Sequence, residues 1–131
     1  MPRTRDAENT RQRIFEAATA EFASHGIAGA RIDRIAAAAK ANKQLIYAYF
    51  GNKRQLFDAV VSEHVTRFVE MVPFRADRLA EFAGAAFDYF IAHPEVMHLA
   101  SWHSLESGKD EHRIPAIEQA IRSRARLLAA A

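Results

Sequence analysis

The segment RIDRIAAAAKANKQLIYAYFGNK, residues 31–53, contains two short stretches whose apolar residues follow helical spacing. The first stretch, residues 31–39, places its two isoleucines on one side of a helix. Asn42 can cap a second helix over residues 43–50, and Gly51 can end it. A three- or four-residue break separates the two helices. Two short helices joined in this way form a helix-turn-helix, in which the second helix contacts DNA bases.

The second of these helices has one apolar side and a small, uncharged opposite side. Ile46 and Phe50 mark the side that a core would bury. Successive residues advance by about 100° around an α-helix. The DNA major groove, about 12 Å wide with phosphates on both rims, accepts a helix of this shape. The outer side carries Gln44, Leu45 and Ala48, with Tyr47 and Tyr49 on its flanks.

Each residue type on this outer side suits a different contact with DNA. Gln44 can bind an adenine through two hydrogen bonds, while Leu45 or Ala48 can touch a thymine methyl group. The two tyrosine hydroxyls can donate to phosphates. Lys43 and Lys53 can do the same near helix N-termini, where backbone N–H groups also favour phosphate. The alternative, from this helix alone, is a partly buried helical hairpin with ordinary amphipathic tyrosines.

Charge is distributed unevenly along the chain. Residues 1–54 hold ten Lys and Arg against five Asp and Glu, whereas residues 55–131 hold eight against eleven. The basic half contains the predicted helix-turn-helix. This asymmetry favours a nucleic-acid-binding end joined to a different kind of end, with chance scatter of charges as the alternative.

The composition is typical of one soluble globular domain. Half of the 131 residues are apolar and 26% are charged, which excludes a disordered polymer. The sequence has no cysteine, which excludes disulfides and thiolate metal sites. No run approaches the roughly 18 apolar residues that span a bilayer, and the N-terminus lacks the apolar region of a signal peptide. We therefore expect a cytoplasmic protein without a membrane segment.

Helical spacing continues through most of the chain and predicts an all-α fold. A first helix is expected to begin near Thr10 with Asn9 as its cap, and to end at Gly26. The expected architecture is a three-helix head followed by an antiparallel helical body. The body helices are predicted after Asn52, at about 77–92, at 94–107 and from Pro115 onward, with a charged linker at 109–113.

The head resembles a known family once its full length is considered. Residues 10–61, TRQRIFEAATAEFASHGIAGARIDRIAAAAKANKQLIYAYFGNKRQLFDAVV, resemble the DNA-binding head of the TetR family of transcriptional regulators. The resemblance includes the specific stretch LIYAYFGNKRQLF. It implies base contacts by Gln44 and Leu45, and phosphate contacts by Tyr47, Tyr49 and Lys53.

The resemblance also implies a division of labour. Residues 1–53 would form the DNA-binding domain, and residues 54–131 a helical body that binds a ligand and dimerises. The implied function is a repressor that binds a palindromic operator as a homodimer and is released by a small apolar or aromatic effector. No cofactor is expected.

The sequence departs from the family pattern at two places, the start of the second helix and the turn after it. Ala30 and Arg31 stand where the family usually has Ser or Thr as a helix cap, so the cap is lost at a cost of about 1 kcal/mol. Arg31 can instead contact a phosphate. Lys40 stands where many members have glycine in the turn, and a positive φ there costs about 1 kcal/mol relative to glycine. Neither change excludes DNA binding.

The body is rich in aromatic residues and methionine. Such a supply is consistent with a cavity for an apolar or aromatic effector. The alternative is that apolar stripes at helical spacing form an ordinary core. The residues that we expect around an effector are Phe68, Phe82, Phe87, Met97 and Trp102.

A His-rich region, residues 93–112, supports an alternative function as a small metal-binding protein or enzyme. His98 and His103 are five residues apart, so they do not share one helix face as residues four apart do. No HExxH, paired-carboxylate or nucleophile motif accompanies them, and we expect neither metal ligands nor catalytic residues. A further alternative is a regulator without effector control.

Both ends of the chain bear on how the protein would bind DNA. Arg3 and Arg5 form either a short basic arm, which can enter a minor groove, or a solvated tail. TetR regulators usually continue through two more long helices that pair across a two-fold axis. The sequence therefore belongs to a fragment, to a shortened member, or to one that dimerises through its last two predicted helices.

Overall fold

The computed structural model describes residues 2–107 and 114–131. Within these residues the all-α prediction is confirmed, because every regular element is helical. The predicted linker at 109–113 lies outside the described residues. In chain order the elements are α1 (Pro2–Gly29), α2 (Ile32–Ala39), α3 (Lys43–Phe50), α4 (Lys53–Met71), the 3-10 helix η1 (Ala76–Arg78), α5 (Leu79–Ala92), α6 (Pro94–Ser107) and α7 (Pro115–Ala130).

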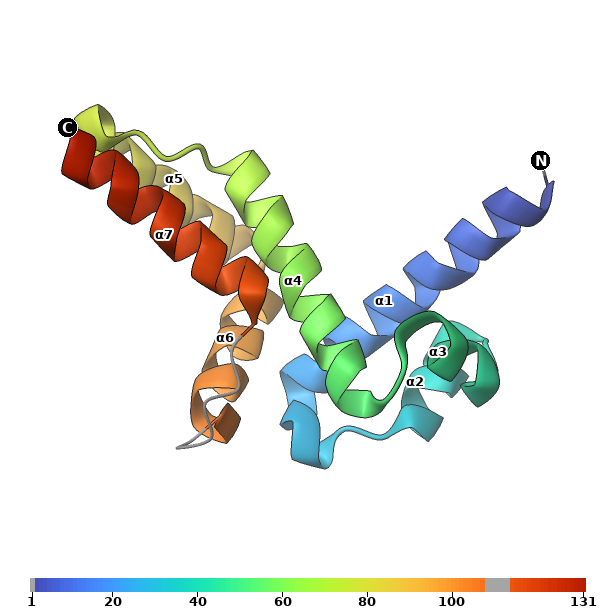
Figure 1. Ribbon diagram of the computed structural model, residues 1–131. Helices are drawn as coiled ribbons and strands as arrows, with labels where there is room; N and C mark the ends of the chain where they lie inside the picture. The colour runs from blue at the N-terminus through green and yellow to red at the C-terminus, as the bar shows by residue number, and fades with distance from the viewer. Residues whose placement is uncertain (1, 108–113) are drawn as a thin grey trace.

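Helix α4 connects two groups of helices (Figure 1). Its N-terminal half packs with α1 and α3, and its C-terminal half packs with α7, while α5 packs with α6. Helix α6 packs closely along α1. The division into domains 1–53 and 54–131 stays a prediction, because α4 and α6 both contact the two groups.

The core of the head forms where apolar residues of α1 meet those of α2, α3 and α4. Phe22 of α1 meets Phe57 of α4 edge to face, with ring centroids 5.1 Å apart. Both are fully buried, as are Ile14, Ile35 and Ile46. Burial of each such side chain contributes roughly 1.5–3 kcal/mol. These contacts fix the rotation of each short helix about its own axis.

Helix α1 begins earlier than its apolar spacing predicts. Helical backbone starts at Pro2, so Asn9 lies inside the helix and the prediction that it caps the helix is wrong. Proline is well suited to a first helical position, where its missing N–H has no partner to lose. Arg3 and Arg5 accordingly lie in the first turns of α1 and form no extended arm. These turns extend beyond the core, so no apolar stripe marks them in the sequence.

Helix α1 is interrupted at Gly26, where the sequence predicts its end, and continues to Gly29. Gly26 has φ 71°, a conformation that favours glycine. A Cβ at this position would lie 2.6 Å from the ring of Trp102 on α6. Glycine is therefore required here both by the backbone and by the close approach of α6.

Two side chains of α6 hold the interrupted end of α1. The Trp102 indole N–H donates to the carbonyl oxygen of Ala23 at 3.0 Å. The Glu106 carboxylate accepts hydrogen bonds from the backbone N–H groups of Ile27 and Ala28 at 2.6 and 2.8 Å. Both N–H groups lie just after the interruption, where a helix start leaves donors without partners. The end of α1 is thus fixed by a helix of the body.

The start of α2 is completed by a side chain from α1. As predicted, Arg31 provides no side-chain cap. Glu21 instead accepts from the Arg31 backbone N–H at 3.0 Å and from Arg34 Nε at 2.8 Å. Burial raises the pKa of Glu21, but the hydrogen bonds from Arg34 and Arg31 and the charge of Arg34 outweigh burial and lower it. A carboxylate from another helix therefore replaces the missing cap.

The turn between α2 and α3 places Lys40 in the conformation whose cost the sequence analysis considers. Lys40 has φ 53°, in the left-handed region. Its backbone N–H points to the carbonyl oxygens of Ala36 and Ala37, which closes α2. Asn42 then caps α3 by accepting from the Leu45 backbone N–H at 2.8 Å. The turn is built correctly with a lysine where glycine is better suited.

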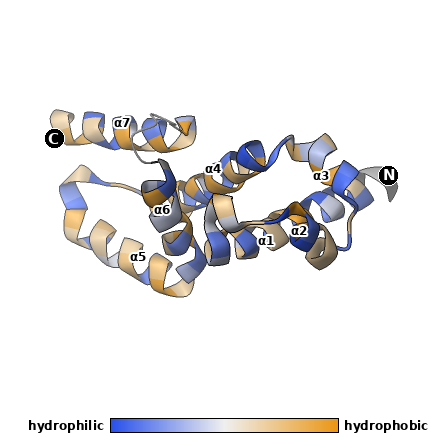
Figure 2. Cartoon of the chain, turned by 90° about the horizontal axis from the view of Figure 1, so that it is seen from below, coloured by the Kyte–Doolittle hydropathy of each residue, from blue (hydrophilic) through white to orange (hydrophobic). Residues whose placement is uncertain are grey.

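The outer side of the body exposes large apolar side chains. Figure 2 shows α5 as largely hydrophobic along its length. The exposed apolar side chains include Leu79, Phe87 and Ile91 of α5 and Ile121 of α7.

The left-handed Lys40 gives a direct test of the turn. Lys40→Gly should raise the free energy of unfolding by about 1 kcal/mol, because glycine adopts positive φ without the steric cost of a Cβ. Urea unfolding followed by circular dichroism measures the change. Lys40→Ala, which removes the charge and keeps the Cβ, is the matched control and should give no such gain. Equal stability of the glycine and alanine variants would contradict the prediction.

Candidate DNA-binding face and effector cavity

The outer face of α3, comprising Gln44, Leu45, Ala48 and the flanking Tyr47 and Tyr49, is exposed along its whole length. Ile46 of the same helix is 0% exposed and Phe50 is half-buried. The core therefore holds α3 by one side and presents the other to solvent. The structure places all five predicted residues of this face together on one surface.

Two of the predicted phosphate-contacting cations lie beside one carboxylate. Arg31 Nη2 is 3.8 Å from Asp33, and Lys43 forms an ion pair with the same carboxylate. All three side chains are at least half exposed. Exposed pairs contribute about 0–1 kcal/mol and are screened by salt, so a phosphate can compete for both cations.

Lys53 has a structural role that the sequence does not reveal. Its side chain is half-buried, and Nζ donates to the carbonyl oxygen of Ala30 at 3.1 Å. This bond joins the start of α4 to the segment between α1 and α2. The ammonium group has three donors, so two protons remain for a phosphate. Asn52 and Gln55 form a reciprocal capping box that fixes the same helix start.

A cavity of about 310 Å³ lies among α4, α5, α6 and α7. Its wall is mainly apolar, and its polar side chains are His64, His103 and Ser104. Among the described residues that line it, none carries a carboxylate, ammonium or guanidinium group. The apolar lining comprises Val61, Val65, Phe68, Phe90, Val96, Leu99, Ala100 and Ile117.

Of the five residues predicted around an effector, the structure brings Phe68 to this cavity. Phe87 and Met97 are 65% and 45% exposed, which places them on the outer surface. Trp102 packs against the end of α1 instead. Phe82 does not line the cavity and belongs to an aromatic group that adjoins it, where it meets Phe68 with ring centroids 6.5 Å apart.

That aromatic group surrounds a cation from α7. The Arg124 guanidinium carbon lies 5.5, 5.8 and 5.7 Å from the ring centroids of Phe68, Phe74 and Phe82. Cation–π contacts of this kind contribute about 0.5–2 kcal/mol each, depending on desolvation. Phe82 thus serves to dock α7 onto α4. The sequence shows that the aromatic residues are apolar, but it does not show which partner each one finds.

His64 is the main residue of the cavity that the sequence reasoning missed. It is buried on α4, and its Nε2 lies 3.0 Å from the hydroxyl of Thr19 on α1. The ring also packs on Phe15, with centroids 4.9 Å apart. The missed signal was spacing, because position 64 follows position 60 by four residues and precedes position 68 by four.

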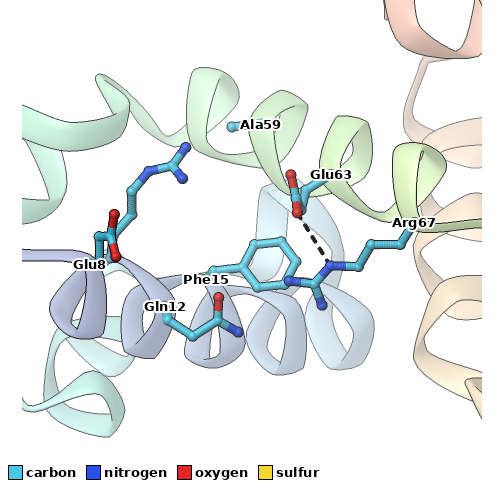
Figure 3. Close-up of a pocket in the computed structure, with 7 residues that line it drawn as sticks. Glu8, Gln12, Phe15, Ala59, Glu63 and Arg67 are labelled. Carbon is cyan, nitrogen blue, oxygen red and sulfur yellow. Dashed lines mark hydrogen bonds and ion pairs between the residues drawn. The ribbon is translucent and has the colours of Figure 1, made fainter. Parts of the chain in front are cut away.

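A polar groove lies between α1 and α4, and a neighbouring groove that shares Phe15 and Arg67 with it is lined by His64. Figure 3 shows the wall of the first groove, where Arg67 reaches from α4 toward α1. The guanidinium lies 4.5 Å from the ring centroid of Phe15 and forms an ion pair with Glu63 at 3.3 Å. The side chains that line the groove carry charges of both signs and do not converge on one point. The groove matters for His64 because Arg67 brings a positive charge near its ring.

The environment of His64 disfavours its protonated form. Burial lowers the pKa of His64 most, and the charge of Arg67 lowers it further, while the carboxylates of Glu95 and Glu63 act in the opposite direction. The net pKa is below the ordinary value. The ring is therefore neutral near pH 7.

The histidines of α6 do not assemble into a metal site. Within residues 2–107 and 114–131 no group of three or more His, Asp or Glu side chains could hold a metal ion. His103 stacks on Phe57 with ring centroids 6.5 Å apart, and His93 lies 3.6 Å from Glu95. His112 and Asp110 lie outside the described residues.

In the described part of the chain, no helix combines the length and hydropathy that crossing a bilayer requires.

The lowered pKa of His64 predicts how stability depends on pH. Below the ordinary pKa of about 6.5 the unfolded chain takes up a proton that the native ring does not, so the free energy of unfolding falls as the pH falls. Urea unfolding at about pH 8 and about pH 5.5 measures this loss. His64→Phe should lose less stability across the same interval than the native chain. An equal loss in both proteins would contradict the assignment to His64.

Comparison with known proteins agrees with this architecture. The family model described as bacterial regulatory proteins, tetR family, matches residues 14–60. The model described as tetracyclin repressor-like, C-terminal domain, matches residues 78–131. The solved structure of SCO4942 from Streptomyces coelicolor superposes with a TM-score of 0.79 at 39% identity, covering 92% of this chain and 64% of that one.

Two curated relatives are described as HTH-type transcriptional repressors. SCO4008 of Streptomyces coelicolor is 53% identical over 107 residues, which is 82% of this chain and 56% of that protein. NicS of Pseudomonas putida is 33% identical over 113 residues, which is 81% of this chain and 53% of that protein. The chain thus spans about half the length of these relatives. Its two matched regions, the helix-turn-helix and the helical body, establish that the chain belongs to the TetR family of transcriptional regulators.

Proposed function

We propose that this chain is a transcriptional repressor that binds a palindromic operator as a homodimer and is released by a small apolar molecule. The observation that carries the proposal is the outer face of α3, which is exposed and uncharged while the opposite side is held in the core. The repressor assignment is supported by the names of the relatives SCO4008 and NicS.

Recognition of bases would come from the centre of the outer face of α3. Gln44 can form two hydrogen bonds to an adenine edge, and Leu45 and Ala48 can contact thymine methyl groups. These three side chains are short or flexible enough for the helix backbone to enter the major groove deeply. They therefore supply sequence discrimination.

Contacts to phosphates would come from the rim of the same surface. Tyr47 and Tyr49 place hydroxyls on the two flanks of α3, while Arg31 and Lys43 place exposed cations at the helix starts. Lys53 would also contact phosphate, through the ammonium protons that its hydrogen bond to the Ala30 carbonyl oxygen does not use. Such contacts fix the orientation of a protein on DNA and depend strongly on salt.

A homodimer would place two α3 helices on successive major grooves. Two half-sites about one helical turn apart, or a multiple of that, require two heads held at a fixed distance. The exposed apolar side chains of α5 and α7 offer surface that a second copy could bury. A single head would bind weakly, because one short helix makes few contacts.

Release from DNA would follow from filling the cavity. Helix α6 forms part of the cavity wall and also holds the end of α1 through Trp102 and Glu106. A molecule that prefers one position of α6 therefore shifts the position of the head. The cavity volume and apolar lining favour a small apolar occupant over a charged one.

Selection from a random DNA pool followed by one substitution tests the base contact of Gln44. The native chain should enrich sites with two-fold symmetry. Gln44→Ala should relax discrimination at one base pair per half-site by about 1–3 kcal/mol, because two hydrogen bonds are lost. Gln119→Ala, an exposed glutamine on α7, is the matched control and should leave the selected sequence unchanged. An unchanged preference in Gln44→Ala would remove its assigned role.

The rim contacts predict a different behaviour. Tyr49→Phe should weaken binding to all DNA sequences by a similar factor, because a phosphate contact carries no base information. Fluorescence anisotropy with the selected site and with a scrambled site, each at two salt concentrations, measures this effect. A loss confined to the selected site would contradict a phosphate contact by Tyr49.

A further inference from the structure

The polar groups of the cavity limit what it can bind. Its lining includes two imidazoles and one hydroxyl in a wall that is otherwise apolar. Burying a charged group without a partner costs far more than burying a neutral group that forms a hydrogen bond. The chemistry of the wall therefore suits an uncharged molecule with a small polar group.

Thr19 determines which nitrogen of His64 carries the proton. The Thr19 hydroxyl has one proton, and it donates that proton to the carbonyl oxygen of Phe15 at 2.8 Å. The same oxygen lies 3.0 Å from His64 Nε2, so Nε2 must be the donor in this pair. In a neutral ring the proton is then on Nε2, and Nδ1 is an acceptor.

His64 borders two hollows, the cavity and a groove that Thr19, Arg67 and Glu95 also line. His64 lines the cavity, and Nδ1 is its only polar atom that Thr19 does not engage. A neutral Nδ1 accepts hydrogen bonds and cannot donate them. Any polar group that meets His64 from the cavity must therefore bring its own proton.

We propose that the cavity binds an uncharged, largely apolar molecule with a hydroxyl or similar donor, and that His64 Nδ1 accepts its hydrogen bond while Thr19 fixes the tautomer. This inference rests on the proposed function, because it concerns the same cavity, and it adds the chemical class of the effector. Thr19 acts as a positioning residue, since it reaches the occupant only through His64.

Burial keeps the His64 ring neutral, and the surrounding charges act in both directions. Arg67 on α4 and His93 before α6 disfavour protonation of His64, whereas Glu63 on α4 and Glu95 on α6 favour it. Burial adds to the first pair and decides the balance, which lowers the pKa. A neutral His64 discriminates against carboxylates, which have no proton to donate near pH 7.

The hydrogen bond between His64 and Thr19 also connects a molecule bound in the cavity to the DNA-binding head. Thr19 is a buried residue of α1, the first helix of the head. A hydrogen bond received at one side of an imidazole polarises the bond donated at the other. A molecule in the cavity that bonds to His64 is thus linked to α1 through this one residue.

Three matched probes test the inference on the native chain. Para-propylphenol has a donor, its methyl ether para-propylanisole keeps the oxygen without the proton, and para-propylbenzoate has a charge. Titration calorimetry at about pH 7.5 should give a dissociation constant about tenfold lower for the phenol than for the anisole, and no tight binding of the benzoate. Equal binding of phenol and anisole, tighter binding of the benzoate, or binding of none of the three would overturn the inference.

Substitutions locate the acceptor. Thr19→Val leaves the imidazole free to change tautomer, so the tenfold preference for the phenol should shrink toward equal binding of phenol and anisole. His64→Phe should also abolish the preference. Ser104→Ala removes another polar group of the same wall and should keep it. A preference lost in Ser104→Ala and kept in Thr19→Val would assign the acceptor to Ser104 and sink the role of His64.

Two further measurements separate failure of this inference from failure of the proposed function. Thermal unfolding of each variant shows whether it is folded before its binding is compared. Binding of the native chain to DNA selected from a random pool, measured without any probe, tests the proposed function alone. DNA binding with equal affinity for phenol and anisole would leave a DNA-binding regulator and overturn the assignment at His64.

Discussion

Burial of Ile46 is the constraint on which the DNA-binding face depends. Helix α3 is only two turns long, and its own hydrogen bonds cannot hold such a short helix in water. Ile46 is 0% exposed and lies in the same core as Phe22 and Phe57. Once this side chain is fixed, the helical period fixes the direction of every other side chain of α3. The outer face of α3 is therefore a consequence of core packing.

The head depends equally on its contacts with the body. The interruption of α1 at Gly26 leaves backbone donors that Glu106 of α6 satisfies, and Trp102 fills the space that a larger residue at position 26 would need. The same helix forms part of the cavity wall. On the other side of the cavity, His64 bonds to Thr19 of α1. Two independent links thus join the cavity to the first helix of the head.

Much of the head could be predicted because its signals are local. Asn42 and Gly51 define the two ends of α3, as their positions in the sequence predict. Exposure of Gln44 and Ala48 follows from helical periodicity alone. The start of α1 could not be predicted in this way, because its first turns extend beyond the core and carry no apolar stripe.

The cavity could not be predicted because its lining depends on distant partners. Phe82 packs around Arg124, and Trp102 bonds to Ala23, so neither lines the cavity. The spacing of His64 from Val60 and Phe68 places it on the same side of α4, but this spacing does not show that its partner is Thr19. The replacement of the α2 cap by Glu21 has the same origin.

The most direct test of this account is photocrosslinking from a single position of α3. Benzoylphenylalanine in place of the exposed Ala48 should form covalent adducts with the bases of a selected duplex, because the outer face of α3 enters the major groove. The same group in place of the exposed Phe87 on α5 should form none. Adducts from position 87 and none from position 48, in protein that retains DNA binding, would show that another surface contacts DNA.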